Sequence, residues 1–130
     1  MDIERKTIFL VDDDATNLTV GKIALAEHYK VLTLDSGFRL LKILEKNIPD
    51  LILLDVEMPE MNGYETIRVL KSKDETRHIP VIFLTAKIGQ EHREEGLSHG
   101  AVDYITKPFS TPHLLRQLAF HLGGREWSNV

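Results

Sequence analysis

The sequence has no cysteine among its 130 residues. The chain therefore forms no disulfide, holds no metal through thiolates and has no cysteine nucleophile, and a reducing compartment suits it. It also lacks a secretion signal and the run of about 18 apolar residues that a membrane-spanning helix needs. We therefore expect a cytoplasmic protein with no membrane contact.

The chain also has no excess of basic residues, because its 20 aspartates and glutamates outnumber its 16 lysines and arginines, which gives a net charge of −4. Proteins that bind nucleic acids usually present a basic surface, so we expect no direct contact with nucleic acid. What the chain does contain, 42% hydrophobic and 28% charged residues, is typical of a globular protein. Its length fits a single domain.

Five short apolar segments alternate with longer mixed segments. The apolar segments, at residues 7–11, 31–34, 51–54, 81–84 and 104–105, include the continuous runs LILL and VIFL, which are typical of strands covered on both faces. The mixed segments predict helices at residues 15–27, 37–45, 63–72, 90–99 and 111–122, most of them preceded by a capping residue such as Asp14. This alternation predicts an α/β fold with a doubly wound, five-stranded parallel sheet.

The predicted helix at residues 90–99, QEHREEGLSH, differs from the others. It has one large apolar residue, and its internal glycine costs about 1 kcal/mol relative to alanine. We expect it to be the least stable helix.

Polar side chains stand at the ends of four predicted strands. Asp12 and Asp13 follow the first strand, Asp55 the third, Thr85 the fourth and Lys107 the fifth. In an open parallel sheet these ends share one edge, where ligands bind. Taken singly, the aspartates fit turns or helix caps, the threonine a strand and the lysine a turn. Together they need another explanation, because two carboxylates about 4 Å apart repel by roughly 4 kcal/mol.

A hard divalent cation would offset that repulsion. Mg²⁺ suits a group of three carboxylates best, with Mn²⁺ as a substitute. A lysine beside it supplies positive charge for a phosphoryl group, and a threonine hydroxyl can donate to a phosphoryl oxygen. Asp55 is then the natural nucleophile for a phosphoryl group.

The segments FLVDDD, LILLDVEMPEMNGYE, VIFLTA and DYITKPF resemble, in this order, the motifs of the receiver domain of two-component response regulators. The resemblance covers residues 6–122. It implies a flavodoxin-like fold with strand order 2-1-3-4-5. It also implies a signalling switch that catalyses only its own phosphorylation and dephosphorylation, with a sensor histidine kinase or a histidine phosphotransfer protein as phosphodonor.

The resemblance also implies roles for individual residues. Asp55 is the phosphoacceptor and Lys107 contacts the phosphoryl group. Mg²⁺ is bound by Asp12, Asp13 and Asp55 together with the backbone carbonyl of Glu57.

Two further residues form the switch that the resemblance implies. Thr85 is drawn towards the phosphoryl oxygens, Tyr104 turns inward, and the surface of the fourth helix, fifth strand and fifth helix changes. The alternative for Tyr104 is a half-buried strand aromatic. Pro108 is expected to form a cis bond that aims Lys107 into the site.

Four residues are expected to flank the site: Glu57, Ala86, Lys87 and Pro108. Glu57 and Lys87 lie two residues beyond Asp55 and Thr85, and an ion pair between them would restrict the attacking water and lengthen the phosphorylated lifetime. The alternative is two solvated charges. Ala86 is small and should leave the phosphoryl group reachable.

Three other functions compete with this one. A haloacid-dehalogenase-like phosphatase needs a second aspartate two residues after its nucleophile, where this chain has Glu57. A flavodoxin-like FMN carrier needs a phosphate-binding loop where this chain has DDDATN, and acids there repel phosphate. A phosphorylation-independent docking module would not need all five site residues.

We expect a receiver domain at residues 1–123. Residues 124–130 are expected to be a polar tail or the start of a linker to an output domain, with Trp127 contacting something beyond it. A phosphorylation-dependent homodimer is a further expectation. The six histidines lack the spacing of metal ligands and are expected on the surface or in packing.

Overall fold

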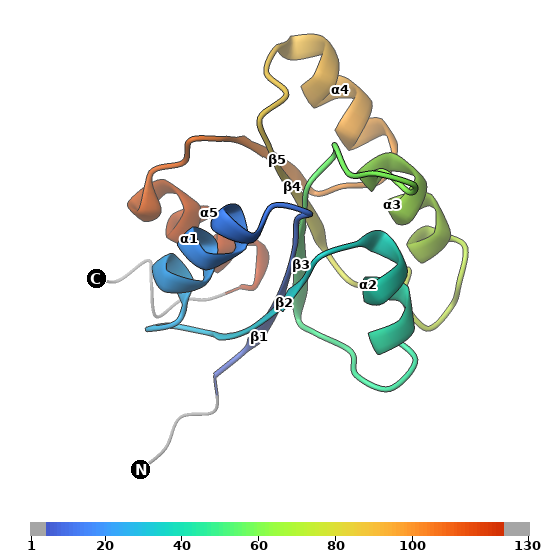
Figure 1. Cartoon of the computed structure of the whole chain (residues 1–130), viewed down its shortest axis with the longest axis horizontal. Coiled ribbons are helices and arrows are strands. Elements are labelled where there is room, and N and C mark those ends of the chain that lie inside the picture. The colour runs from blue at the N-terminus through green and yellow to red at the C-terminus, as the bar shows by residue number, and fades with distance from the viewer. Residues whose placement is uncertain (1–4, 124–130) are drawn as a thin grey trace.

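The computed structural model describes residues 5–123, so the expected tail at 124–130, with Trp127, lies outside the described residues. Strands and helices alternate within them (Figure 1): β1 (Thr7–Val11), α1 (Ala15–Leu25), β2 (Lys30–Leu34), α2 (Gly37–Ile43), β3 (Leu51–Leu54), α3 (Gly63–Lys71), β4 (Val81–Thr85), α4 (Gln90–Ser98), β5 (Asp103–Thr106) and α5 (Thr111–His121). The strands form one parallel sheet in the order β2-β1-β3-β4-β5, which confirms the predicted fold and strand order.

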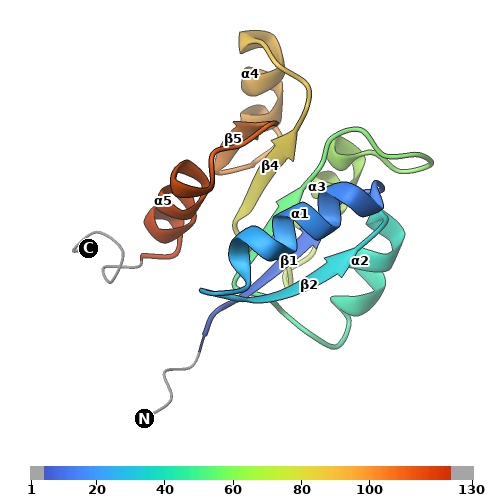
Figure 2. The ribbon, with the colours of Figure 1, turned by 60° about the vertical axis from the view of Figure 1, so that its left-hand side comes forward.

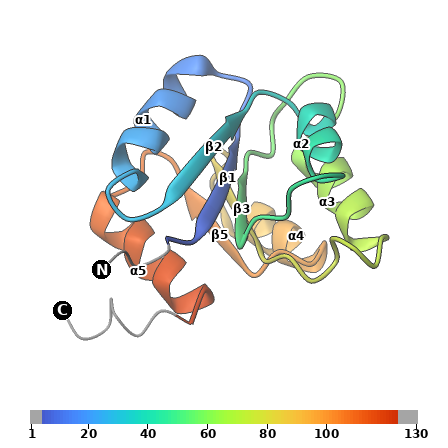
Figure 3. The ribbon, with the colours of Figure 1, turned by 90° about the horizontal axis from the view of Figure 1, so that it is seen from below.

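The sheet is covered on both faces, as its continuous apolar runs predict. Helices α1 and α5 lie on one face and α2, α3 and α4 on the other (Figures 1 and 3). Side chains of β1 alternate between the two layers, since Phe9 and Val11 join one core cluster while Ile8 and Leu10 join the other. Every residue of β3 and β4 is buried, which fixes the strand ends that follow them.

The predicted helix ends are wrong by one or two residues. Helices α1 and α2 end two residues early because the chain closes tight turns there, in which His28 N donates to Leu25 O and Glu45 N to Lys42 O. The predicted cap at the start of α1 is confirmed, since the Asp14 side chain accepts hydrogen bonds from the two backbone amides of residues 16 and 17.

Helix α4 buries fewer of its residues than any other helix of residues 5–123. Gly96 is its only buried residue, and Gly89 at its N-cap offers no side-chain hydrogen bond. Figure 2 shows α4 beside β4 and β5, away from α1 and α2. Within residues 5–123, no helix combines the length and the apolar character needed to cross a bilayer.

Candidate functional site

Four strands bring their carboxyl ends to one edge of the sheet, and each delivers a polar side chain there. Asp12 follows β1, Asp55 follows β3, Thr85 ends β4 and Lys107 follows β5. The exposed fractions of Asp12, Asp55 and Thr85 are 3%, 7% and 0%, whereas Asp13 is exposed. The parallel topology therefore gathers the five side chains that the sequence points to.

Lys107 supplies positive charge between two of the buried acids. Its Nζ donates to Asp12 Oδ2 and lies 3.4 Å from Asp55 Oδ2. The peptide bond between Lys107 and Pro108 is cis. Buried charges are costly unless they are paired, so the lysine offsets part of the repulsion among the strand-end acids.

The three acids form a cluster that fits a hard cation. Asp12, Asp13 and Asp55 each place a carboxylate oxygen within 4.8 Å of the others. Backbone amides orient two of these carboxylates, because Asp14 N donates to Asp12 Oδ1 at 2.9 Å and Glu57 N donates to Asp55 Oδ1 at 3.4 Å. The donors are all carboxylate oxygens, with no nitrogen or sulfur, and Mg²⁺ and Mn²⁺ prefer such ligands.

The environment of Asp55 opposes its charge. Burial raises the pKa of Asp55 above the ordinary value of 3.8, and the neighbouring Asp12 adds to the rise. Lys107 and a hydrogen bond from the Thr85 hydroxyl act in the opposite direction. Additional positive charge at the cluster would favour the carboxylate form, which is the nucleophilic one.

The backbone of Lys87 links two side chains that the sequence could not connect. Its amide donates to the Thr85 hydroxyl at 3.3 Å, and its carbonyl accepts a hydrogen bond from the Tyr104 hydroxyl at 2.8 Å. The loop after β4 therefore joins the end of one strand to an aromatic ring on the next. Ala86, between Thr85 and Lys87, is exposed.

Tyr104 lies inward, more buried than the half-buried aromatic that was the alternative prediction. Its exposed fraction is 4%. Burial raises the pKa of Tyr104 to about 12, and the nearby phenol of Tyr64 adds to the rise. Tyr64 contacts Phe83 edge to face and stacks on His99 at 4.9 Å between ring centroids. The sequence alone did not indicate this aromatic cluster between α3, α4 and the sheet.

The predicted ion pair at the mouth of the site is present. Lys87 Nζ lies 3.6 Å from Glu57 Oε2, with side chains 33% and 63% exposed. Both residues line a pocket of about 500 Å³ beside Asp13, together with Met58 and Tyr64. The pair therefore borders the solvent approach to the acidic cluster.

Gly63, which the sequence predicts only as the first residue of a helix, supports the site through its backbone. A Cβ atom there would lie 2.3 Å from the backbone carbonyl oxygen of Asp55. Gly63 N also donates to Val56 O at 2.8 Å. The signal available in the sequence is the segment MNG, in which Asn62 caps α3 and only glycine allows the helix to start this close to the strand end.

Comparisons with known proteins agree with this geometry. The sequence matches the response regulator receiver domain family over residues 8–119. It is 41% identical, over 99% of its length, to a probable cyclic di-GMP phosphodiesterase of Vibrio cholerae, but it spans only 29% of that protein. It is 34% identical to the polar-differentiation response regulator DivK of Brucella anthropi, with 91% of this chain and 97% of DivK covered.

A solved receiver domain has a fold similar to that of this chain. The receiver domain of a sensor histidine kinase from Pseudomonas aeruginosa, which has a magnesium ion coordinated in its active-site cleft, aligns with a TM-score of 0.85 and 33% identity, covering 92% of this chain and 99% of that one. The family match runs from β1 into α5 and includes every strand end that carries the site. The chain therefore belongs to the response regulator receiver domain family.

Proposed function

We propose that this domain is a phosphorylation-controlled switch of a two-component system and that Asp55 is its phosphoacceptor. The observation that carries the proposal is the Asp55 carboxylate, which is buried at the sheet edge, 3.4 Å from the Lys107 ammonium, in a cluster with Asp12 and Asp13. Receiver domains of response regulators take their phosphoryl group from histidine kinases, so a phosphohistidine on a sensor kinase or on a phosphotransfer protein is the proposed donor.

In the proposed transfer, an Asp55 oxygen attacks the phosphorus of phosphohistidine. A P–O bond forms as the P–N bond breaks, and the released imidazole takes up a proton from solvent. Lys107 can neutralise a phosphoryl oxygen, and the Thr85 hydroxyl can donate to another. The groups that would hold Mg²⁺ are the carboxylates of Asp12, Asp13 and Asp55 and the backbone carbonyl of Glu57. When bound, the ion supplies positive charge for the phosphoryl oxygens.

The same site would return to its resting form by hydrolysis. Water attacks the phosphorus, the bond to Asp55 breaks, and inorganic phosphate leaves. Ala86 leaves the phosphoryl group open to water, whereas the Glu57 and Lys87 pair narrows the approach. We therefore propose that this ion pair lengthens the phosphorylated lifetime.

Thr85 would transmit the effect of phosphorylation from Asp55 to the rest of the domain. A movement of its hydroxyl towards the phosphoryl group would move Lys87, which is hydrogen-bonded to both Thr85 and Tyr104. The inward position of Tyr104 is the one that we expected phosphorylation to produce. We propose that phosphorylation stabilises this position and thereby changes the surface of α4, β5 and α5.

The phosphodonor needs a docking surface that adjoins the site, and the exposed apolar side of α1 suits it. Val20 and Ile23 are 51% and 72% exposed. They line a pocket of about 590 Å³ with Phe109 and Lys107, so the apolar surface continues into the site. Ile23→Asp is expected to slow transfer from a protein donor and to leave labelling by acetyl phosphate unchanged.

Two of the relatives are much longer than this chain. The chain spans 29% of the phosphodiesterase and 22% of the response regulator PleD of Caulobacter vibrioides, so in these relatives the matching region is one part of a longer protein. We propose that residues 1–123 act as a cytoplasmic receiver domain that controls an output domain, a partner or a homodimer.

The test is labelling with a small phosphodonor and Mg²⁺. The wild-type chain should gain the mass of one phosphoryl group, and Asp55→Asn should gain none. Asp14→Asn is the matched control, because Asp14 only caps α1 and asparagine caps a helix equally well. Equal labelling of Asp55→Asn and the wild type would refute the proposal. An absence of labelling, together with no response to Mg²⁺ and beryllofluoride, would favour a docking module.

A further inference from the structure

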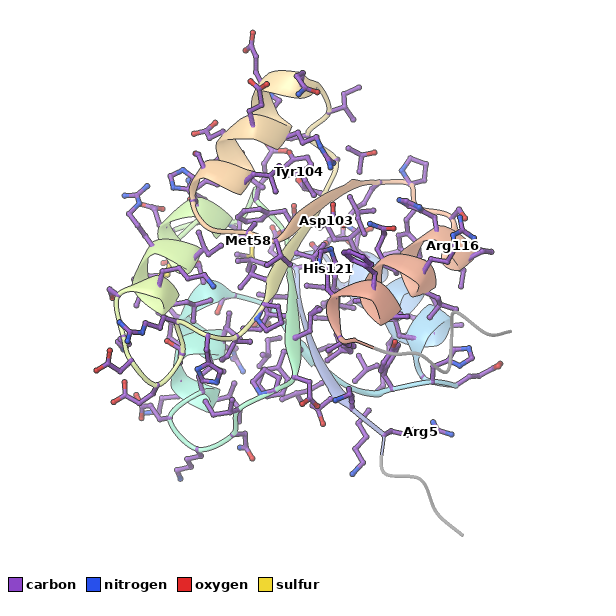
Figure 4. The ribbon with its side chains drawn as sticks, turned by 180° about the vertical axis from the view of Figure 1, so that it is seen from behind. Arg5, Met58, Asp103, Tyr104, Arg116 and His121 are labelled. Atoms are coloured by element: carbon purple, nitrogen blue, oxygen red, sulfur yellow. The ribbon has the colours of Figure 1, made fainter. Side chains whose placement is uncertain are left out.

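A second buried carboxylate lies on β5, away from the acidic cluster. Asp103 is 7% exposed and directly precedes Tyr104. Figure 4 shows it between Tyr104 and His121, the last residue of α5. The proposed phosphoryl transfer makes no use of it.

The two oxygens of this carboxylate serve different helices. Oδ1 accepts a hydrogen bond from Tyr104 N at 2.8 Å and lies 3.7 Å from a guanidinium nitrogen of Arg93 on α4. Oδ2 accepts from Gln117 Nε2 at 2.6 Å and lies 3.0 Å from His121 Nε2, both on α5. A single buried charge therefore bridges α4 and α5 across the strand that carries Tyr104.

Arg93 makes this bridge important for α4. Besides facing Asp103, it donates to the backbone carbonyl of Tyr104 at 2.9 Å. The helix otherwise buries only Gly96, whose position allows no Cβ because one would lie 2.8 Å from the Tyr104 ring. A helix held by so few apolar contacts depends on its polar tether for its position.

The carboxylate is held in its charged form. Burial alone would raise the pKa of Asp103, but the hydrogen bonds from Gln117, from the Tyr104 amide and from His121 outweigh it and lower the pKa. At neutral pH a negative charge is therefore shared between the Arg93 side of the carboxylate and its α5 side.

We infer that Asp103 is a positioning residue that couples α4 to α5. When α4 is displaced, Arg93 leaves Oδ1, and the unshared charge binds Gln117 and His121 more strongly, so that the last turn of α5 responds. The coupling also works in the other direction, because a change in the contact between His121 and Asp103 alters the interaction of Asp103 with Arg93. The inference deepens the proposed function and rests on it, since it names the path by which a change near Tyr104 reaches α5.

The test follows amide resonances and the His121 ring resonances of the 130-residue chain by NMR, with Mg²⁺ and beryllofluoride as the probe. In the wild type, resonances near Asp55, in α4 and in α5 should all shift on addition of the probe. In Arg93→Gln, the shifts near Asp55 should persist while those of α5 and the His121 ring are lost. Arg93 is half exposed, so this variant should fold.

The matched control removes the same charge elsewhere. Arg116→Gln changes an exposed arginine on α5 that Figure 4 shows pointing away from Asp103, and its α5 shifts should equal those of the wild type. Full α5 shifts in Arg93→Gln, with the shifts near Asp55 also present, would overturn the coupling and leave the proposed function intact. No shift near Asp55 in the wild type would overturn both. Asp103→Asn is a second variant, expected to separate the α4 response from the α5 response.

Discussion

Replacing Gly63 by alanine should damage both the fold and the site, because the start of α3 touches the backbone that carries Asp55. The added methyl carbon would lie 2.3 Å from the Asp55 carbonyl oxygen, 2.9 Å from Val56 Cα and 3.0 Å from the Phe83 ring. Ordinary contacts begin at 3.4 Å. Helix and strand end must therefore separate by about 1 Å, since neither backbone can rotate away as a side chain can.

The size of the effect follows from two opposing contributions. Overpacking of this kind lowers the free energy of unfolding by about 1–3 kcal/mol. Replacing glycine by alanine in a helix raises it by at most about 1 kcal/mol. A net loss of about 1–2 kcal/mol should lower the Tm by roughly 5 °C in a domain of this size. A shift of about 1 Å in the Asp55 carboxylate should weaken Mg²⁺ binding by about tenfold or more.

The assay is calorimetric unfolding together with a Mg²⁺ titration followed by NMR. Gly21→Ala is the matched control, because its methyl carbon would approach Leu10 Cδ2 at 2.6 Å, the far end of a flexible side chain that can turn away. Gly21 lies inside α1, where alanine favours the helix. The control should keep its Mg²⁺ affinity and lose no Tm. A Gly63→Ala protein with wild-type Tm and Mg²⁺ affinity would refute the reasoning.

Three further predictions concern charge. Lys107→Met leaves two buried carboxylates without the ammonium group that pairs with them, so the free energy of unfolding should fall by about 3 kcal/mol. Urea denaturation should show a smaller loss when Mg²⁺ is added. An equal loss with and without Mg²⁺ would contradict this prediction. Replacing Glu57 and Lys87 together by alanine should leave the Tm unchanged, because exposed ion pairs are worth under about 1 kcal/mol. The double substitution should nevertheless speed the loss of the phosphoryl group from Asp55. An unchanged dephosphorylation rate would argue against the proposal that the ion pair restricts the attacking water. Asp103→Asn should lower the free energy of unfolding by about 1–3 kcal/mol near pH 7. Because the pKa of Asp103 is lowered in the folded state, this loss should be complete above the ordinary value of 3.8 and should disappear as the pH falls through the folded-state pKa. Urea denaturation that shows the same loss at low pH would refute the prediction.

The fold could be predicted because its signals are local and repeated. Runs such as LILL have no polar residue to turn towards water, and in the structure all of β3 is buried between two layers of helices. Helix ends were less predictable, because the turns after Leu25 and Ile43 are settled by a few local backbone hydrogen bonds that composition does not encode.

The acidic edge could be predicted for a topological reason. Once the strands are parallel, Asp12, Asp55, Thr85 and Lys107 share one edge of the sheet, and the strand order that the resemblance implies then brings them together. The hydrogen bonds of Asp103 could not be predicted in this way. Gln117 and His121 are 14 and 18 positions further along the chain, and only the angle at which α5 packs on the sheet brings them to the carboxylate. Their i, i+4 spacing on one helix face was the available signal.

The division between rigid and loose elements explains why a switch can be built here. The strands before Asp55 and Thr85 are buried over their whole length, so a movement at the strand ends cannot be absorbed by the close-packed sheet. Helix α4 buries one glycine and is tied to β5 mainly through Arg93. We therefore expect a small displacement that starts at the proposed phosphorylation site to be expressed in α4, which buries the fewest residues, and in the elements to which Arg93 is bonded.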